Sequence, residues 1–455
     1  MSPDPQDALP LPLRPDVGQY RKLAKELVKA CASREPGAIG DWVDRWLDSL
    51  ARALGEARPE GASHWDRKAD DIEAFAKGKL LAGERPCVLA DAQFVLARAH
   101  GFESWPKFAA HLDALAHRST EEAAFEAAAD AVVEGDEAEL RRLLAEQPGL
   151  IRQRSTREHR ATLLHYVSAN GVEGWRQETP PNAVAIARIL LDGGAEVDAE
   201  ADMYGGGSTT LGLVATSAHP RGAGVQIPLL ELLLAHGARM EHPNLAGNDH
   251  SAVMACIANG CPEAAAYLAE RGAWLDFVTA AAVGRFDLMR AHVERTSEGV
   301  TATQAQLEAA LRYACMHGHT EIARYLMQKG ADPAHHGRNG QTALHYAAIG
   351  GQVETLRMLL ERDDPPLEAR NEYGGTVLGQ ALWSAAHGGD PDDYVAIIDA
   401  LVAAGAQVLE RHPPVNAKVD AALARHGSVA DPEDYWFGER PRRRRPPAAP
   451  AAGDE

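Results

Sequence analysis

The sequence contains few aromatic residues and no long uninterrupted hydrophobic run. Phe, Trp and Tyr make up 6% of its 455 residues, which argues against an aromatic-rich β-sandwich or barrel and favours helices packed through alanine. No stretch approaches the roughly 18 consecutive apolar residues of a membrane-spanning helix. The opening MSPDPQDALPLPLRPD has acids and prolines where a signal peptide needs a basic start and an apolar core. We therefore expect a cytoplasmic protein with no membrane partner.

Cysteine is scarce and irregularly placed. The five cysteines form no C-x-x-C pair and no even-numbered framework; they are Cys31, Cys87, Cys256, Cys261 and Cys315. Such spacing is typical of free thiols in a reducing compartment.

Positive charge is also in short supply. With 46 Lys and Arg against 65 Asp and Glu, the formal net charge is −19, so the body of the chain should repel nucleic acids and anionic membranes. The hydrophobic fraction of 45% is nevertheless high enough for a packed structure. A folded protein that does not bind nucleic acid is expected.

Two short motifs recur in the part of the chain that follows residue 120. A Gly-Ala ending occurs as LLDGGA (190–195), LLAHGA (233–238), LAERGA (268–273), LMQKGA (326–331) and LVAAGA (401–406). Each glycine follows a helical run and would adopt the left-handed conformation that ends a helix. A Thr or Ser opens the second motif as a helix cap, in TLLHYVSANG (162–171), TTLGLVATSA (209–218), SAVMACIANG (251–260) and TALHYAAIGG (342–351). Together the motifs predict pairs of short antiparallel helices.

The strings TALHYAAIGG and LMQKGADP resemble the T-P-L-H-x-A motif and hairpin entry of ankyrin repeats. This resemblance implies an all-α solenoid of about eight helix pairs over 121–410. In residues 9–118 the strings LPLRPDVGQYRKLAKEL and DAQFVLARAHGFESWPKF resemble a helical extension that precedes ankyrin arrays in many bacterial proteins. Residues 411–428 are expected to form a capping helix and 438–455 a disordered tail.

The N-terminal segment has a helical stripe that contains Trp42 and Trp46. These tryptophans could form a ligand platform, but their spacing on an apolar helix face favours a place in the core. Ser104 and Pro106 are expected to start a further helix after a break at Gly101.

Catalytic and metal motifs are absent from the sequence. It has no phosphate-binding loop, no G-x-S-x-G and no H-E-x-x-H. Cys315, His317 and His319 straddle a helix end, where they cannot all converge on one ion. The ankyrin resemblance gives His165 and His345 a structural role, as partners of the capping threonine and of neighbouring backbone. No enzyme activity, cofactor or metal is expected.

The resemblance also implies two binding surfaces, the first helix of each pair and the tips of the hairpin turns. Mapped onto this sequence, the candidate interface residues are Asn170, Met203, Tyr204, Asn259, Met316, His317, Arg338, Asn339, Gln341, Glu372, Tyr373 and Trp383. The aromatic, methionine and arginine members are the expected anchors, although the two tyrosines could instead pack on the next hairpin. Insertions such as Gly171–Pro181, which carries Trp175, are either a second contact surface or tolerated loops.

These features predict a monomeric, non-catalytic protein-binding module, an adaptor or an inhibitor, whose partner the sequence does not identify. One alternative uses the tail arginines Arg440, Arg442, Arg443, Arg444 and Arg445, which could bind an acidic partner or nucleic acid or could dock on the acidic body. A second alternative is an enzyme with an unrecognised site in residues 1–120.

Overall fold

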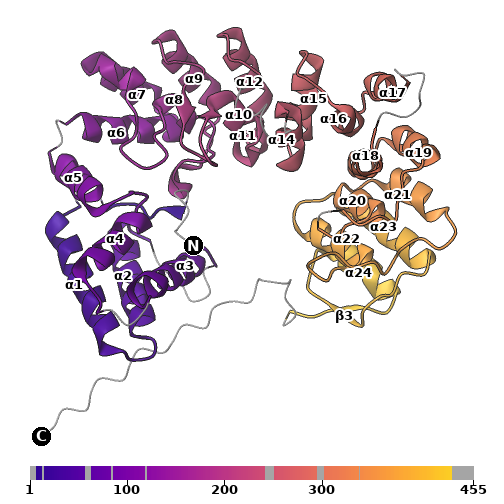
Figure 1. Cartoon of the computed structure of the whole chain (residues 1–455), viewed down its shortest axis with the longest axis horizontal. Coiled ribbons are helices and arrows are strands. Elements are labelled where there is room, and N and C mark those ends of the chain that lie inside the picture. Colours follow the sequence, from indigo (N-terminus) through magenta and orange to yellow (C-terminus); the bar gives the residue numbers. More distant parts are fainter. Residues whose placement is uncertain are drawn as a thin grey trace, which may run out of the picture. The chain divides into compact units, whose positions relative to one another are not determined.

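The computed structural model describes residues 7–12, 15–56, 63–82, 86–117, 120–240, 251–294, 302–337 and 339–432. The chain divides into two compact units, one containing Met1–Met240 and the other Glu241–Arg440 (Figure 1). This boundary lies inside the segment predicted as one solenoid, so we describe each group of repeats within its own unit. Within the described ranges, no helix is long and apolar enough to cross a membrane.

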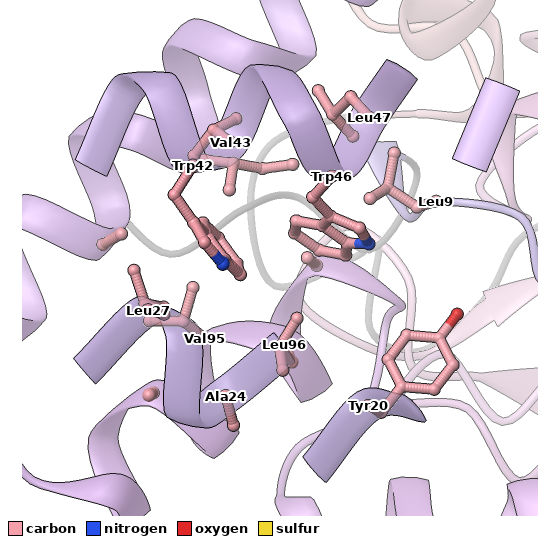
Figure 2. Packing of buried hydrophobic residues seen from close by; sticks show 14 of the residues in the cluster. Leu9, Tyr20, Ala24, Leu27, Trp42, Val43, Trp46, Leu47, Val95 and Leu96 are labelled. Atoms are coloured by element: carbon pink, nitrogen blue, oxygen red, sulfur yellow. The ribbon is translucent and has the colours of Figure 1, made fainter. Parts of the chain in front are cut away.

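The first unit begins with a helical module that has its own apolar core. Its helices are α1 (Val17–Ser33), α2 (Ala38–Ala53), α3 (Ser63–Leu80), α4 (Leu89–Ala99) and α5 (Trp105–Ala116). Trp42 and Trp46 are only 2% and 4% exposed and lie among aliphatic side chains of α1 and α4 (Figure 2). Their predicted place in the core is confirmed. Ser104 caps α5 and Pro106 occupies its first turn, also as predicted.

Three helix pairs follow in the described part of the first unit. They are α6 (Glu121–Glu134) with α7 (Glu137–Glu146), α8 (Leu163–Tyr166) with α9 (Ala183–Asp192), and α10 (Thr210–Ala215) with α12 (Gln226–Ala235). Short elements fill the connections: η2 (Pro148–Arg152), η3 (Gly174–Arg176), α11 (Ala218–Gly222), and an antiparallel pairing of β1 (Glu200–Ala201) with β2 (Ser208–Thr209).

The second unit contains five helix pairs among its described residues. These are α14 (Ala252–Ala258) and α15 (Pro262–Glu270), α16 (Phe277–Ala282) and α17 (Phe286–Glu294), α18 (Gln304–Met316) and α19 (Thr320–Gln328), α20 (Ala343–Ile349) and α21 (Val353–Leu360), and α22 (Val377–Ala386) and α23 (Pro391–Ala403). The first helices α16, α18, α20 and α22 pack each on the next (Figure 1). The all-α solenoid class predicted from the motifs is confirmed.

The helix ends follow the predicted chemistry. The glycines of the five Gly-Ala endings all have positive φ, from 88° at Gly237 to 103° at Gly405, a region where a Cβ is costly. Hydroxyl caps open the first helices: Thr209 Oγ1 accepts from Gly212 N at 3.3 Å, and Ser251 Oγ accepts from Met254 N at 3.1 Å.

The last helix of the described chain is α24 (Ala417–Arg425), which packs on α23. This helix lies where the capping helix was expected. Two residues on either side of it form a parallel pairing of β3 (Arg411–His412) with β4 (Val429–Ala430), which the sequence did not indicate. His412 holds the arrangement together, because its buried ring contacts Ser428 Oγ at 2.8 Å and Asp420 Oδ1 at 3.2 Å. The predicted tail 438–455 lies outside the described residues.

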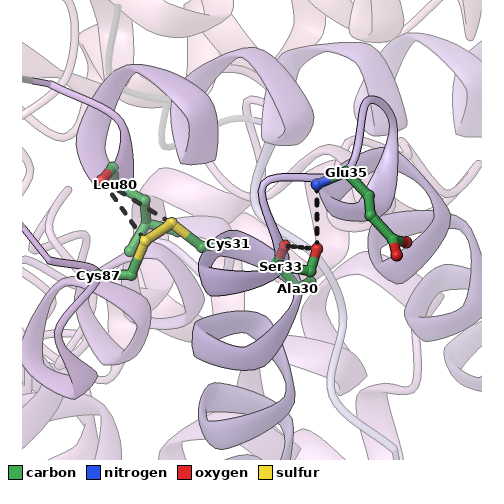
Figure 3. The surroundings of a disulfide bond; sticks show 6 residues. All are labelled: Ala30, Cys31, Ser33, Glu35, Leu80 and Cys87. Carbon is green, nitrogen blue, oxygen red and sulfur yellow. Dashed lines mark hydrogen bonds between the residues drawn. A yellow bond between two sulfur atoms is a disulfide. The ribbon is translucent and has the colours of Figure 1, made fainter.

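One prediction about the cysteines is wrong. Cys31 at the end of α1 and Cys87 just before α4 form a disulfide, with Cα atoms 6.2 Å apart (Figure 3). The 56 residues of separation gave no sign of the pairing, because it depends on how α1 and α4 pack against each other. Cys256, Cys261 and Cys315 remain buried thiols.

Candidate functional site

The motif histidines hold adjacent repeats together from inside the protein. His165 and His345 are fully buried. Each ring accepts from the backbone N–H of its capping threonine through Nδ1, at 3.1 Å for Thr162 and 3.2 Å for Thr342. Through Nε2 each ring donates to the next hairpin, to Ser208 O at 3.2 Å and Gly375 O at 3.4 Å. Burial lowers the pKa of His165 to about 4 and also lowers that of His345, so both rings act as neutral structural links.

Cys315, His317 and His319 point to different surroundings, as expected from their place at the end of α18. Cys315 is wholly buried, and burial raises the pKa of its thiol. His319 donates through Nε2 to Ala282 O of the preceding repeat at 3.0 Å. Across the described ranges, no group of three His, Cys, Asp or Glu side chains could hold a metal ion.

The first helices of three adjacent repeats in the second unit carry a row of partly exposed apolar and aromatic side chains. We call it the exposed row; it consists of Tyr313 and Met316 on α18, Tyr346 and Ile349 on α20, and Trp383 on α22. Ile349 and Trp383 each stand seven residues after a capping threonine, and Met316 and Ile349 each stand two residues before a glycine with positive φ. The row therefore repeats two positions of the motif: Met316, Ile349 and Trp383 occupy one, and Tyr313 and Tyr346 occupy another that lies three residues earlier.

Close packing of these helices brings the row together. A Cβ on Gly350 would lie 1.8 Å from the carbonyl oxygen of Met316, so only glycine allows α18 and α20 to approach this closely. The rings of Tyr313 and Tyr346 meet edge to face with centroids 5.8 Å apart, a favourable geometry for aromatic pairs.

Trp383 is the most exposed member of the row, at 45%. Its ring stacks on that of His387 at 4.2 Å, and His387 Nδ1 contacts the carbonyl oxygen of Trp383 at 2.6 Å. These contacts hold the indole in one orientation at the surface. Trp383, a candidate interface residue in the sequence, therefore lies at the surface.

The hairpin tips of the second unit are linked by backbone bonds. Glu372 N donates to Asn339 O of the preceding hairpin at 2.9 Å, and Asn371 Oδ1 accepts from Tyr373 N at 3.1 Å. Tyr373 is 57% exposed, and a hydrogen bond to the Glu372 carboxylate raises the pKa of its hydroxyl. Glu372 and Tyr373 are thus presented at the tip rather than packed on the next hairpin.

The first-unit candidates form a separate set of contacts. Tyr204 has a positive φ of 52° and is 63% exposed, and its hydroxyl donates to Asn170 Oδ1. The Asn170 amide in turn donates to Leu213 O at 3.1 Å and Thr216 Oγ1 at 3.2 Å. Tyr204 is thereby tied, through Asn170, to the end of the first helix α10.

The remaining candidates divide by exposure. Asn259 is exposed, whereas Met316, His317 and Asn339 are half-buried. Met203 is 3% exposed and Gln341 is 9% exposed. Both side chains are buried, so their prediction as surface contacts is wrong. Met203 packs against Gly171, and the Gln341 amide points to Gln380. Arg338 and the tail arginines Arg440–Arg445 lie outside the described residues.

A buried ionic cluster in the first unit escaped the sequence reasoning. We call it the junction cluster; it consists of Glu126 on α6, Arg157 on the following hairpin, and Glu173 and Arg176 on the insertion. Glu126 Oε2 lies 3.2 Å from Arg157 Nη2 and 2.8 Å from Arg176 Nη1, and Arg157 Nε pairs with Glu173. All four residues are at most 9% exposed.

The junction cluster connects the first repeats to the helical module. Arg157 Nη1 donates to His100 O at the end of α4 at 2.9 Å, and His111 of α5 lies 4.0 Å from Glu126. Burial alone would raise the pKa of Glu126, but Arg157 and Arg176 outweigh it and hold that pKa at about 2. Burial lowers the pKa of His111 to about 4. At neutral pH the cluster therefore contains two carboxylates and two guanidinium groups, and the neutral His111 lies beside it.

This arrangement changes the interpretation of the 171–181 insertion. The side chains of Glu173 and Arg176 point into the protein. Trp175 is half-buried, and the guanidinium carbon of Arg157 lies 5.3 Å from the centre of its indole ring. A second contact surface centred on Trp175 is not what the structure shows. The insertion instead supplies charges to the protein interior.

Comparison with known proteins identifies the last four helix pairs of the second unit. The family model described as ankyrin repeats, three copies, matches residues 277–371 and 311–411. Residues 277–411 are ankyrin repeats. The exposed row lies wholly within these ankyrin repeats. A search of curated proteins finds no match to the chain.

Proposed function

We propose that the chain is a non-catalytic protein-binding module and that the exposed row is its principal contact surface. Ankyrin repeats are generally protein-interaction modules, as the family match of residues 277–411 implies. The observation that carries the proposal is the row itself, five apolar or aromatic side chains on adjacent first helices. Aromatic residues and methionine are enriched where protein interfaces gain most of their binding energy.

The chemistry of the row supports a partner that presents an apolar segment. Trp383 offers a large face that is already ordered by stacking on His387, which reduces the entropy lost on binding. Glu372 and Tyr373 at the neighbouring hairpin tip add a carboxylate and a hydroxyl at the polar edge. Such a combination of an apolar centre with a polar rim is typical of specific interfaces.

The test uses the full chain as bait for proteins from its own cells, followed by quantitative mass spectrometry. A double variant, Met316→Ala with Trp383→Ala, should lose the specific partners, because two anchors are truncated at the centre of the surface. Leu409→Ala is the matched control, since this side chain is 74% exposed and lies outside the row. It should retain every partner.

Two outcomes would count against the proposal. Partners that bind equally to wild type and to the double variant would place the interface elsewhere. An intact chain that enriches no protein over an empty support would remove the protein-binding function. Circular dichroism of each variant shows whether a loss of binding reflects a loss of folding.

A further inference from the structure

The five cysteines fall into two chemically different groups. Cys256, Cys261 and Cys315 are 0% exposed in the repeats, and burial raises the pKa of the Cys256 thiol to about 12. Thiols in such surroundings are inert, because the thiolate is the reactive form. Cys31 and Cys87 differ because they are already linked.

The two linked sulfurs differ in access. Cys31 is 2% exposed and belongs to the apolar core of the helical module. Cys87 is only partly buried and stands in the connection that leads into α4, beside the exposed side chain of Val88. A small molecule can therefore reach the disulfide from the Cys87 side.

We propose that Cys31 and Cys87 form a reversible thiol-exchange site for small thiols of the glutathione class. The thiolate of such a molecule attacks Cys87 Sγ and forms a mixed disulfide there, while the S–S bond breaks and Cys31 leaves as a thiolate that takes up a proton. A second thiolate then attacks the sulfur of the bound small molecule and releases Cys87 as a thiolate, which is also protonated. The protein disulfide gains two electrons and two protons, and the two small thiols lose them to become one disulfide.

The fold is prepared for the reduced state as well. The carbonyl oxygen of Leu80 lies 3.9 Å from both Cys31 Sγ and Cys87 Sγ (Figure 3). After reduction each thiol would have this acceptor for its weak S–H donor. Because Leu80 ends α3, the site joins the ends of α1 and α3 to the start of α4 in one redox-dependent contact.

Exchange at this site would change the stability of the helical module. The disulfide connects residues that are 56 positions apart, and a cross-link over such a span restricts the unfolded chain strongly. Reduction should therefore lower the melting temperature of the first unit by roughly 8–17 °C while the second unit keeps its own.

Mass spectrometry of the full chain tests the proposal. The protein is incubated in mixtures of reduced and oxidised glutathione, quenched with acid and alkylated. Cys31 and Cys87 should convert together between the disulfide and alkylated forms, whereas Cys256 and Cys315 should alkylate only after denaturation. A glutathione adduct should be trapped on Cys87, and incubation with oxidised glutathione should modify Cys87 in the Cys31→Ser variant at least about tenfold faster than Cys31 in the Cys87→Ser variant.

Three results would overturn the proposal. One is a disulfide that persists in fully reduced glutathione while the protein is folded. Another is an adduct on Cys31 rather than Cys87. The third is equal modification of all five cysteines in the native protein. If either serine variant fails to fold, the site of the adduct in the wild-type protein still decides between Cys87 and Cys31.

Discussion

The two units build the same helix pair and share the histidine link between repeats, but the first unit adds a second kind of interaction. In the second unit, the buried His345 links the capping threonine of one repeat to the hairpin of the next by neutral hydrogen bonds. In the first unit, the repeats nearest the helical module add the junction cluster, whose charged groups reach the end of α4. The family model matches only the former region. Repeats that contact a different module as well as other repeats therefore keep the histidine link and gain buried charged partners.

The largest expected effect comes from removing one charge of the junction cluster. Glu173→Gln leaves the buried Arg157 with Glu126 as its single close carboxylate, and breaking a buried ion pair in this way costs about 3–5 kcal/mol. Urea unfolding followed by tryptophan fluorescence should show the loss, since Trp42, Trp46 and Trp175 all lie in the first unit.

Glu354→Gln in the second unit is the matched control, because Glu354 is exposed. It should change the free energy of unfolding by less than about 0.5 kcal/mol. Equal effects of the two variants would break the distinction between the units.

Acidification should also lower the stability of the first unit more than that of the second. Because the folded pKa of Glu126, about 2, lies below its ordinary value of 4.5, its contribution is present above pH 4.5 and is lost as the pH falls toward 2. The loss is on the order of 3 kcal/mol. His111 acts in the same direction at higher pH, because its folded pKa of about 4 lies below 6.5 and protonation is disfavoured in the fold.

Urea unfolding at pH 6 and at pH 3 would measure this dependence. In Glu126→Gln, the free energy of unfolding should be lower at pH 6 than in the wild type. It should also fall less between pH 4.5 and pH 3, because the carboxylate that titrates there is gone. A variant with an unchanged pH profile would show that the carboxylate is not held ionised by Arg157 and Arg176.

The features that sequence could predict are those that repeat or depend on neighbours along the chain. The positive φ of Gly330 and the caps at Thr162 and Thr342 follow from local chemistry, and the burial of Trp42 follows from helical spacing. Within the candidate site, Trp383 stands at a position that the motif itself identifies.

The features that were missed depend on contacts between distant segments. Glu126 and Arg176 are 50 residues apart and read as ordinary surface charges, and nothing local shows that the 171–181 insertion turns inward. The same holds for the Cys31–Cys87 pairing. Met203 and Gln341 occupy hairpins, as expected, but the direction of their side chains is set by an adjacent repeat, the preceding one for Met203 and the next one for Gln341.

A smaller effect is expected from the motif histidine. His345→Leu removes the acceptor for Thr342 N and the donor to Gly375 O, which should cost about 1–3 kcal/mol because buried polar groups lose their partners. His165→Leu should cost a similar amount in the first unit, since its ring makes the same contacts. Thermal unfolding of both variants beside the exposed His117→Leu would measure the difference. A much larger loss for His165 would mean that the first unit depends on the motif as well as on its charges.

The smallest expected change in stability comes from replacing single glycines by alanine, which tests backbone strain without removing a side-chain contact. Gly330→Ala should cost about 1 kcal/mol, because φ is +100° and no atom lies within 4 Å of the added Cβ. Gly78→Ala is the matched substitution in the first unit; this glycine lies within α3 and also has open space around a Cβ, but its φ is not in the left-handed region. Here alanine should stabilise the protein by about 0.5–1 kcal/mol, since glycine weakens a helix interior. Chemical denaturation of the two variants should therefore give shifts of opposite sign, and shifts of the same sign would show that left-handed glycine is not what ends the helices of the ankyrin repeats.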